Sequence, residues 1–205
     1  VESRAQMNFL PRMRPKCFYD LVIQVAIIRP GPIQGDMVHP YLRRRNGQEV
    51  VSFPSDALGR VLGKTLGVPL FQEQAMQIAI IGAGFTPDQA DRLRRSLATF
   101  KKHGSVSEFR GLFMKGMRER GYSDEAINTL WEILVPFSDY AFNKAHTAGY
   151  GLVSFWTAYL KANYPAEYMA ALLTSVKDDK SENSKLSVYL NECRRMGIKV
   201  LPPDV

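Results

Sequence analysis

The spacing of apolar side chains changes near residue 56, and this change separates two predicted regions. Before that point, prolines and glycines interrupt the pattern at positions 11, 15, 30, 31, 32, 35 and 40. Residues 18–28 carry apolar side chains at helical spacing, so they predict one short helix within this region. The helix must end before Pro30, because proline lacks an amide donor and restricts the residue that precedes it.

After residue 56 the periodicity is helical, and local signals mark where helices begin and end. Thr86, Pro87 and Gln89 supply a capping threonine, a proline at the first helical position and a glutamine at the capping-box position. Serines at 105 and 123 predict two further helix starts. Later helices are predicted at 143–163, 166–176 and 184–196, the last ended by Gly197, and residues 198–201 predict a short strand.

The segment at 78–84, Ile-Ala-Ile-Ile-Gly-Ala-Gly, resembles a strand that enters the glycine-rich turn of a dinucleotide-binding enzyme. Pro87 occupies the third glycine position of that motif, and no acidic residue ends a second strand about 20 residues later. We therefore predict a helix from Gln72 to Ile81, ended by Gly82 and Gly84. The dinucleotide-binding enzyme stays open as the weaker alternative.

These patterns predict a mainly α, multi-helix fold. The helical body is expected at 56–197, after a Pro/Gly-rich segment at 1–55 and before the start of a following segment at 198–205. Short irregular or β segments are expected near the N- and C-termini.

Composition narrows the class of partner. The chain has 205 residues, a formal net charge of +7 and 45% hydrophobic residues, which is typical of a globular protein that binds polyanions. Cys17 and Cys193 lie far apart and predict reduced thiols in the cytoplasm. No apolar run approaches the ~20 residues of a membrane span, so we expect no membrane partner. The chain begins at Val1 without a signal peptide, like a piece of a longer protein.

A basic segment at 90–102 is the first candidate site. Ala90, Leu93, Leu97 and Phe100 are spaced to form a buried stripe, and the remaining face carries Arg94, Arg95, Lys101 and Lys102 with little internal neutralisation. The alternative is an ordinary solvated helix face. Arginine forks around phosphate oxygens better than lysine does, and this favours phosphate binding at Arg94 and Arg95.

The second candidate site is the predicted helix start at Asn143. Free backbone N–H groups and the positive end of the helix dipole suit an anion there. Lys144 adds charge, and His146 adds a hydrogen-bond donor. A structural histidine is the alternative for His146 alone.

Other patterns carry less information. Arg43, Arg44 and Arg45 predict a basic turn that is a candidate contact for a DNA backbone, together with Lys101 and Lys102. Aromatic residues in the last third at helical spacing predict core positions: Phe155, Trp156, Tyr159, Tyr164 and Tyr168. We find no metal-ligand spacing and no nucleophile triad, so neither a metal site nor a catalytic residue is predicted within this chain.

Several motifs in one order resemble a known family. They include Phe-Tyr-Asp-Leu at 18–21, Arg-Pro-Gly-Pro at 29–32, Phe-Gln-Glu-Gln-Ala-Met at 71–76, Ala-Asp-Arg-Leu-Arg-Arg at 90–95, Tyr-Ala-Phe-Asn-Lys-Ala-His at 140–146, Tyr-Pro-Ala-Glu at 164–167 and Leu-Pro-Pro-Asp at 201–204. The chain resembles the fingers region of bacterial C-family DNA polymerases, which comprise the DNA polymerase III alpha subunit and an error-prone relative. Segments before about residue 120 resemble the error-prone branch, and those after about 136 resemble the replicative branch.

The resemblance implies a DNA-directed DNA polymerase whose fingers bind deoxynucleoside triphosphates and primer–template DNA in the bacterial cytoplasm. It assigns Arg94, Arg95, Asn143, Lys144 and His146 to the nucleotide. It places the Mg²⁺-binding aspartates in the palm, upstream of this chain, so the chain alone is expected to be inactive. Other replisome or damage-tolerance subunits are expected to bind outside it. A non-catalytic helical nucleic-acid-binding module is the alternative.

Overall fold

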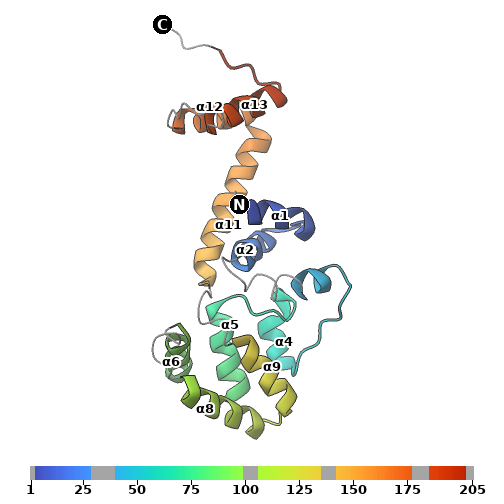
Figure 1. Cartoon of the computed structure of the whole chain (residues 1–205), viewed down its shortest axis with the longest axis vertical. Coiled ribbons are helices and arrows are strands. Elements are labelled where there is room, and N and C mark those ends of the chain that lie inside the picture. Colours follow the sequence, from blue (N-terminus) through green and yellow to red (C-terminus); the bar gives the residue numbers. More distant parts are fainter. Residues whose placement is uncertain (1–2, 29–39, 99–105, 135–141, 177–184, 202–205) are drawn as a thin grey trace. The chain divides into compact units, whose positions relative to one another are not determined.

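The computed structural model describes residues 3–28, 40–98, 106–134, 142–176 and 185–201 (Figure 1). The ordered elements in these ranges are helices. Phe71 and Phe142 form an isolated bridge, and the described residues build no sheet. The mainly α fold class is therefore confirmed.

Packing divides the chain into two units, Val1–Leu152 and Val153–Val205, and the division falls within α11. The first unit contains α1 (Arg4–Met13), α2 (Phe18–Ile27), a helical stretch at 40–45, α4 (Asp56–Leu62), the 3₁₀ turn η1 (Gly63–Thr65), α5 (Gln72–Gln77), the π-helical turn η2 (Ile78–Gly82), α6 (Pro87–Ala98), α8 (Val106–Glu119), α9 (Asp124–Leu134) and the start of α11 (Lys144–Asn163). The second contains the rest of α11, α12 (Pro165–Ser175) and α13 (Lys185–Arg195).

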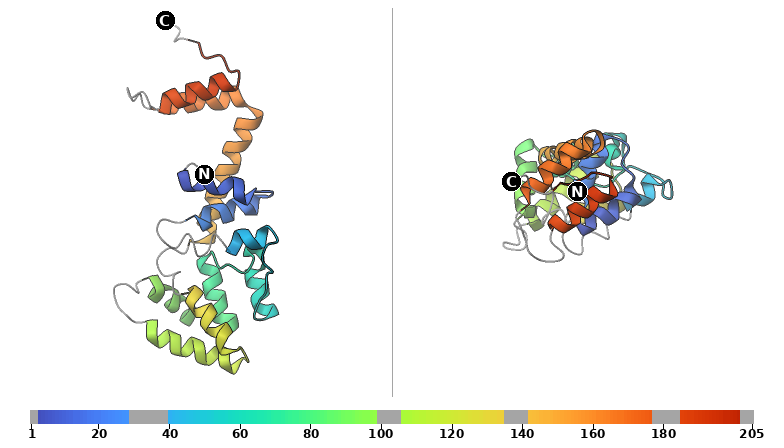
Figure 2. Two further views of the ribbon diagram at one scale, coloured as in Figure 1. Left: turned by 45° about the vertical axis from the view of Figure 1, so that its right-hand side comes forward. Right: turned by 90° about the horizontal axis from the view of Figure 1, so that it is seen from above.

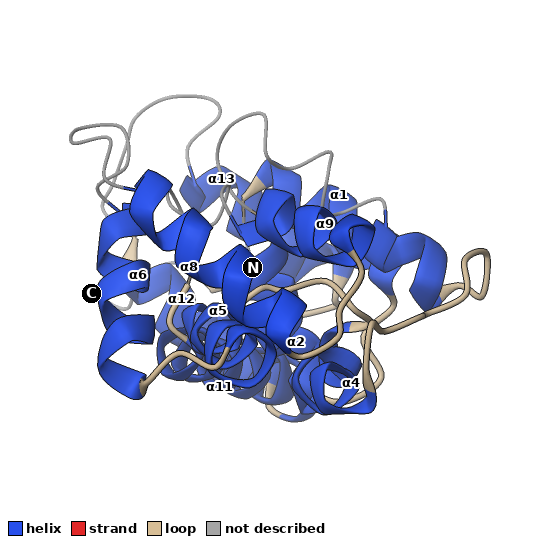
Figure 3. Cartoon of the chain, turned by 90° about the horizontal axis from the view of Figure 1, so that it is seen from below, coloured by secondary structure: helices blue, strands red, loops and turns tan. Residues whose placement is uncertain are grey.

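The centre of the first unit is the helix made by α5 and η2, against which α4, α6 and α8 pack (Figure 2). The prediction of a helix through Ile81 is confirmed, although its second half is π-helical. Gly84 follows with a φ of +72°, a backbone conformation that favours glycine. Since residues 78–82 are helical, the strand that a dinucleotide-binding motif needs is not formed there. Figure 3 accordingly colours no described segment as a strand.

Gln74 fixes the start of this central helix. Its Oε1 accepts hydrogen bonds from the backbone N–H groups of Leu70 (2.8 Å) and Phe71 (3.2 Å). Its Nε2 donates to the carbonyl oxygen of Val61 (3.1 Å) and to Thr65 Oγ1 (2.9 Å). One buried side chain thus satisfies the donors at the helix start and ties α5 to α4 and η1.

Local helix signals read from the sequence are largely confirmed. Thr86 Oγ1 accepts from the N–H of Gln89, and Gln89 Oε1 accepts from the N–H of Thr86, so the capping box is formed. Ser123 caps α9. The predicted cap at 105 lies outside the described residues. The helix predicted at 18–28 is confirmed as α2, while α1 and the helical stretch at 40–45 were not predicted for the region before residue 56.

In the second unit, Glu192 of α13 joins its own helix to α11. Its carboxylate accepts hydrogen bonds from Arg195 Nε (2.7 Å) and Lys161 Nζ (2.9 Å), which lower the pKa of Glu192 to about 2. Gly197 has a φ of +72° and ends α13 as predicted. The predicted strand at 198–201 is wrong: these residues form no regular element and have no strand partner in the described chain, and a strand needs one to form its ladder.

An aromatic cluster in the first unit joins α8 to α9 and to the residues that follow η2. Phe113 of α8 is fully buried, with its ring centroid 5.3 Å from that of Trp131 and 6.4 Å from that of Phe85. Gly116, one turn further along α8, lies directly over the backbone carbonyl of Ala83, and a Cβ there would overlap that oxygen. The close approach of α8 to the end of η2 therefore requires glycine.

Two glycines of α8 make a matched test of this packing. Gly116→Ala is expected to lower the free energy of unfolding by about 2–3 kcal/mol, because the helix must move away from Ala83. Gly111→Ala, where a Cβ meets open space, is expected to raise it by about 1 kcal/mol through helix propensity. Urea unfolding measures both. Equal effects of the two substitutions would contradict the close approach.

Candidate phosphate-binding surface

The start of α11 is fixed by contacts to α5 and α2. The backbone N–H of Gln72 donates to the carbonyl of Phe142 (3.1 Å), beside the bridge between Phe71 and Phe142. Gly151 lies against α2, where a Cβ would stand 3.3 Å from Val22 Cγ2. Gly151 therefore allows α2 to approach α11 closely.

The backbone N–H groups at this helix start are not free, contrary to expectation. Asn143 Oδ1 accepts from the N–H groups of Ala145 (2.9 Å) and His146 (3.2 Å), as an N-cap side chain does. The N–H of Lys144 donates to both carboxylate oxygens of Glu73, at 3.1 and 3.2 Å. The helix dipole already faces a carboxylate, so side chains and not backbone amides are left to meet a ligand.

Lys144 shares an aromatic ring with a second lysine that the sequence did not single out. Its Nζ lies 5.6 Å from the centroid of the Tyr19 ring, and Lys64 Nζ lies 5.8 Å from the same centroid. Both distances are typical of cation–π contacts. Burial raises the pKa of Tyr19, so its hydroxyl stays neutral and the ring serves as an uncharged support for two ammonium groups. Lys64 stands in a 3₁₀ turn, and no sequence signal marks it.

His146 belongs to an exposed row of rings. Its ring is parallel to Phe142 within 4°, with centroids 6.2 Å apart, and its centroid is 4.7 Å from that of Tyr150. His146 and Tyr150 are exposed and Phe142 is half-buried. Exposed rings of this kind offer flat faces on which nucleic-acid bases can stack.

On α6 the predicted buried stripe is present. Ala90, Leu93 and Leu97 are buried, while Phe100 lies outside the described residues, as do Lys101 and Lys102. The cationic face is less free than expected, because Asp91 accepts from Arg94 and Arg95 together.

Asp91 acts as a shared partner for the two arginines. Its Oδ1 accepts from Arg94 Nε and Nη2 (2.9 and 2.8 Å), and its Oδ2 lies 2.5 Å from Arg95 Nη2. Hydrogen bonds from Arg94 and then Arg95 lower the pKa of Asp91. The Arg95 side chain is still 71% exposed. Asp91 therefore orients the pair without covering it.

The three consecutive arginines end the helical stretch at 40–45 and do not form the predicted turn, which follows at 46–47. Arg43 is half exposed and pairs with Glu49 at 2.8 Å. Arg44 donates to Glu49 and to the carbonyl of Leu66. Arg45 turns inward and pairs with Asp20 at 2.7 Å. The exposure of the side chain falls from Arg43 to Arg45 along this helical turn, which a run of identical residues cannot reveal.

The predicted core positions in the last third are wrong. Phe155, Trp156, Tyr159 and Tyr164 are each about half exposed, and Tyr168 is half-buried. Helical spacing identified a common face, but nothing in the described part of their unit covers it. Spacing alone does not tell a covered face from an open one.

The described parts of the chain contain no group of three His, Cys, Asp or Glu side chains that could hold a metal ion. None of the described helices combines the length and apolarity needed to cross a membrane.

The two candidate cation sets border the same helix. α6 packs along α5, and the start of α11 is hydrogen-bonded to the first residues of α5 through Gln72 and Glu73. Segments separated by about 50 positions in sequence thus bring Arg94 and Arg95 on one side, and Lys144 and His146 on another, to the surroundings of one helix.

Comparisons with known proteins identify the family to which the chain is similar. The model of the bacterial DNA polymerase III alpha subunit finger domain matches residues 1–121. The error-prone DNA polymerase of Methylococcus capsulatus is 50% identical over 205 residues, covering 100% of this chain and 19% of that protein. That of Vibrio parahaemolyticus is 48% identical over 202 residues, covering 98% and 19%. Error-prone DNA polymerase 3 of Agrobacterium fabrum is 54% identical over 175 residues, covering 85% and 16%.

The chain spans about a fifth of the length of these relatives. The match to the Methylococcus capsulatus protein extends over the whole chain, including the part after residue 136.

Proposed function

Because this chain belongs to the bacterial DNA polymerase III alpha subunit finger family, we propose that it binds the incoming deoxynucleoside triphosphate and primer–template DNA of an error-prone DNA polymerase. The observation that carries the proposal is the placement of two cation sets around α5. Each set has an internal partner that orients it, Asp91 on α6 and Tyr19 beside Lys144, and each stays exposed to solvent.

In this proposal Arg94 and Arg95 hold the triphosphate, and Lys144 adds a second positive charge. Their charges stabilise the negative charge that develops on the phosphates during transfer, which is an electrostatic role. Asn143 positions Lys144 and His146 by capping α11. The His146 ring provides a stacking face and an N–H donor.

Contacts to the DNA backbone are assigned to Arg43, Lys101 and Lys102. Arg43 is the most exposed of the three consecutive arginines. The exposed ion pair that it makes with Glu49 is weak enough to exchange for a phosphate. Arg44 and Arg45 support it from within the fold.

The parent enzyme is proposed to synthesise DNA in the bacterial cytoplasm during damage tolerance or repair. Mg²⁺ supplies charge neutralisation at the reacting phosphates when it is bound, and we assign its ligands to residues outside this chain, as the resemblance to C-family polymerases implies. Other subunits are proposed to bind outside this chain. The isolated chain is expected to show no primer extension.

The proposal is tested in a full-length polymerase that carries this chain in place of the matching segment of the Methylococcus capsulatus enzyme. Lys144→Ala is expected to weaken the apparent Kd of the incoming nucleotide about tenfold, because one charge-assisted contact to phosphate is lost. Single-turnover incorporation at varied nucleotide concentration gives that Kd.

Lys115→Ala is the matched control, because Lys115 is exposed on α8 and makes only a 3.9 Å ion pair with Glu119. His146→Phe keeps the aromatic row and removes the N–H donors, so it separates stacking from hydrogen bonding. A non-catalytic nucleic-acid-binding module would show weaker DNA binding in Lys144→Ala with an unchanged nucleotide Kd, and that result would reject the proposal.

A further inference from the structure

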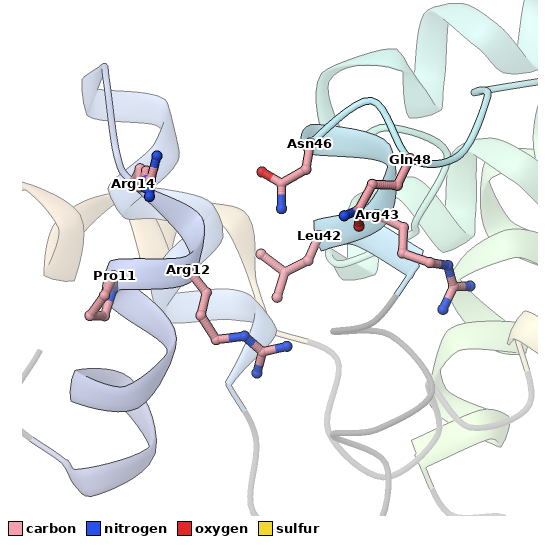
Figure 4. Close-up of a pocket in the computed structure, with 7 residues that line it drawn as sticks. All are labelled: Pro11, Arg12, Arg14, Leu42, Arg43, Asn46 and Gln48. Atoms are coloured by element: carbon pink, nitrogen blue, oxygen red, sulfur yellow. The ribbon is translucent and has the colours of Figure 1, made fainter.

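A pocket of about 570 Å³ lies between α1 and the residues at 40–48 (Figure 4). Its polar lining consists of three arginines and two amides, with no carboxylate: Arg12, Arg14, Arg43, Asn46 and Gln48. Pockets of this volume accept small organic ligands. A pocket whose polar lining consists of guanidinium and amide groups favours an anion.

Two arginines stand on the α1 side of this pocket. Arg12 and Arg14 are exposed, and neither forms an ion pair with any residue that the structure describes. Figure 4 shows Arg12 reaching from α1 toward the opposite wall, from which Leu42 and Asn46 point back. Arg43 instead turns toward Glu49, its partner at 2.8 Å. Two guanidinium groups are therefore available to a ligand, and a third is held nearby in a weak, exposed pair.

The two walls are locked together by Arg45. Its Nε donates to the carbonyl of Met13 (2.7 Å), its Nη2 donates to the carbonyl of Arg14 (3.1 Å), and both terminal nitrogens donate to Asp20. The guanidinium thus joins the helical stretch at 40–45 to the last residues of α1. A pocket with fixed walls needs little rearrangement to bind its ligand.

Arg14 also has an unusual backbone conformation. It ends α1 with φ 49° and ψ 73°, in the left-handed region that favours glycine and asparagine. An arginine there is conformationally less favourable than asparagine, so stability alone does not explain its side chain.

We propose that the pocket between α1 and residues 40–48, here named the arginine pocket, binds a phosphate group through Arg12, Arg14 and Asn46. The phosphate belongs either to a DNA strand or to a free polyphosphate. Arginine matches phosphate oxygens through two parallel hydrogen bonds, and the amide of Asn46 adds a neutral donor. For its DNA source the inference rests on the proposed function, and for a free polyphosphate it does not.

The test compares two double variants of the 205-residue chain with the same change in net charge. Arg12→Gln with Arg14→Asn removes the pocket guanidiniums. Arg4→Gln with Arg110→Gln removes two exposed arginines on α1 and α8 outside the pocket. Binding of a fluorescein-labelled single-stranded DNA oligonucleotide is followed by anisotropy, and binding of inorganic tripolyphosphate by calorimetry.

The pocket variant is expected to bind at least one probe about tenfold more weakly than the wild type, while the control changes less than twofold. Loss with both probes assigns the pocket to phosphate in general, and loss with DNA alone assigns it to a strand. Equal behaviour of the two double variants with both probes would overturn the inference.

A folding defect is separated from a binding defect by Arg14→Asn alone. Asparagine adopts the left-handed conformation more readily than arginine, so the melting temperature is expected to hold or rise while phosphate affinity falls. An unchanged affinity for both probes in this variant would also count against the pocket. Failure here leaves the nucleotide Kd of Lys144→Ala untouched, so the inference and the proposed function fail independently.

Discussion

Replacing Arg95 with alanine in a full-length polymerase that carries this chain is expected to lower kcat/KM for nucleotide incorporation about 100-fold. The Arg95 side chain is 71% exposed and makes an ion pair to Asp91, so its removal takes an oriented charge from the surface of α6. Loss of one such group that stabilises transition-state charge costs about 10² in rate. Pre-steady-state incorporation measures the effect.

Three variants on the same helix sharpen this result. Arg92→Ala removes an exposed arginine from α6 and is expected to leave incorporation within about twofold of the wild type. Arg95→Lys keeps the charge but loses the planar fork, so an intermediate rate is expected. Asp91→Asn keeps both arginines and loosens their orientation, and its effect is expected to be smaller than that of Arg95→Ala.

Equal losses in Arg92→Ala and Arg95→Ala would mean that α6 contributes only a general positive field. A lowered melting temperature in Arg95→Ala would instead reveal a structural role, which the exposure of its side chain does not predict. Wild-type kinetics in Arg95→Ala would remove α6 from the proposed nucleotide site.

Sequence reasoning succeeded where the cause of a structure is local. The box between Thr86 and Gln89 is formed by atoms three residues apart, so the pattern contains all that is needed to predict it. The stop at Gly197 depends on one left-handed residue and was predicted for the same reason. The buried stripe of α6 follows from spacing alone.

It failed where a distant segment decides the outcome. Glu73 accepts a hydrogen bond from the backbone N–H of Lys144, 71 positions away in the sequence. Lys64 and Lys144 lie close together because both contact the ring of Tyr19. No pattern within a helix contains this information. The prediction that the aromatic residues at 155–164 are buried failed for another reason. Their helical spacing is correct, but nothing in the described part of their unit covers the face that they share.

Arg45 is the clearest case of a residue whose role the sequence hides. In the chain it is the third of three like residues, yet its side chain is only 17% exposed and meets Asp20, 25 positions away, at 2.7 Å. Burial acts to raise the pKa of Asp20, but hydrogen bonds from Arg45 and from the N–H of Lys16 outweigh it and lower that pKa. The pair is therefore ionised and hydrogen-bonded in the folded protein.

Arg45→Met is expected to lower the free energy of unfolding by about 3–5 kcal/mol, because it leaves the Asp20 carboxylate buried without its counter-charge. Arg43→Met is the matched control from the same helical turn. It breaks an exposed pair, so its expected cost is about 0–1 kcal/mol. Urea unfolding at neutral pH measures both variants.

Acidification is expected to reduce the difference in the free energy of unfolding between the wild type and Arg45→Met. The folded-state pKa of Asp20 is lowered, so the unfolded chain binds its proton first and the pair stabilises the fold fully above the ordinary carboxyl pKa of about 4. That stability is lost as the pH falls through the folded-state value. In Arg45→Met the Asp20 carboxylate lacks this partner, so acidification lowers the free energy of unfolding of the variant by less than that of the wild type. A gap that stays constant from pH 7 to pH 3 would show that Arg45 acts through packing and not through its charge.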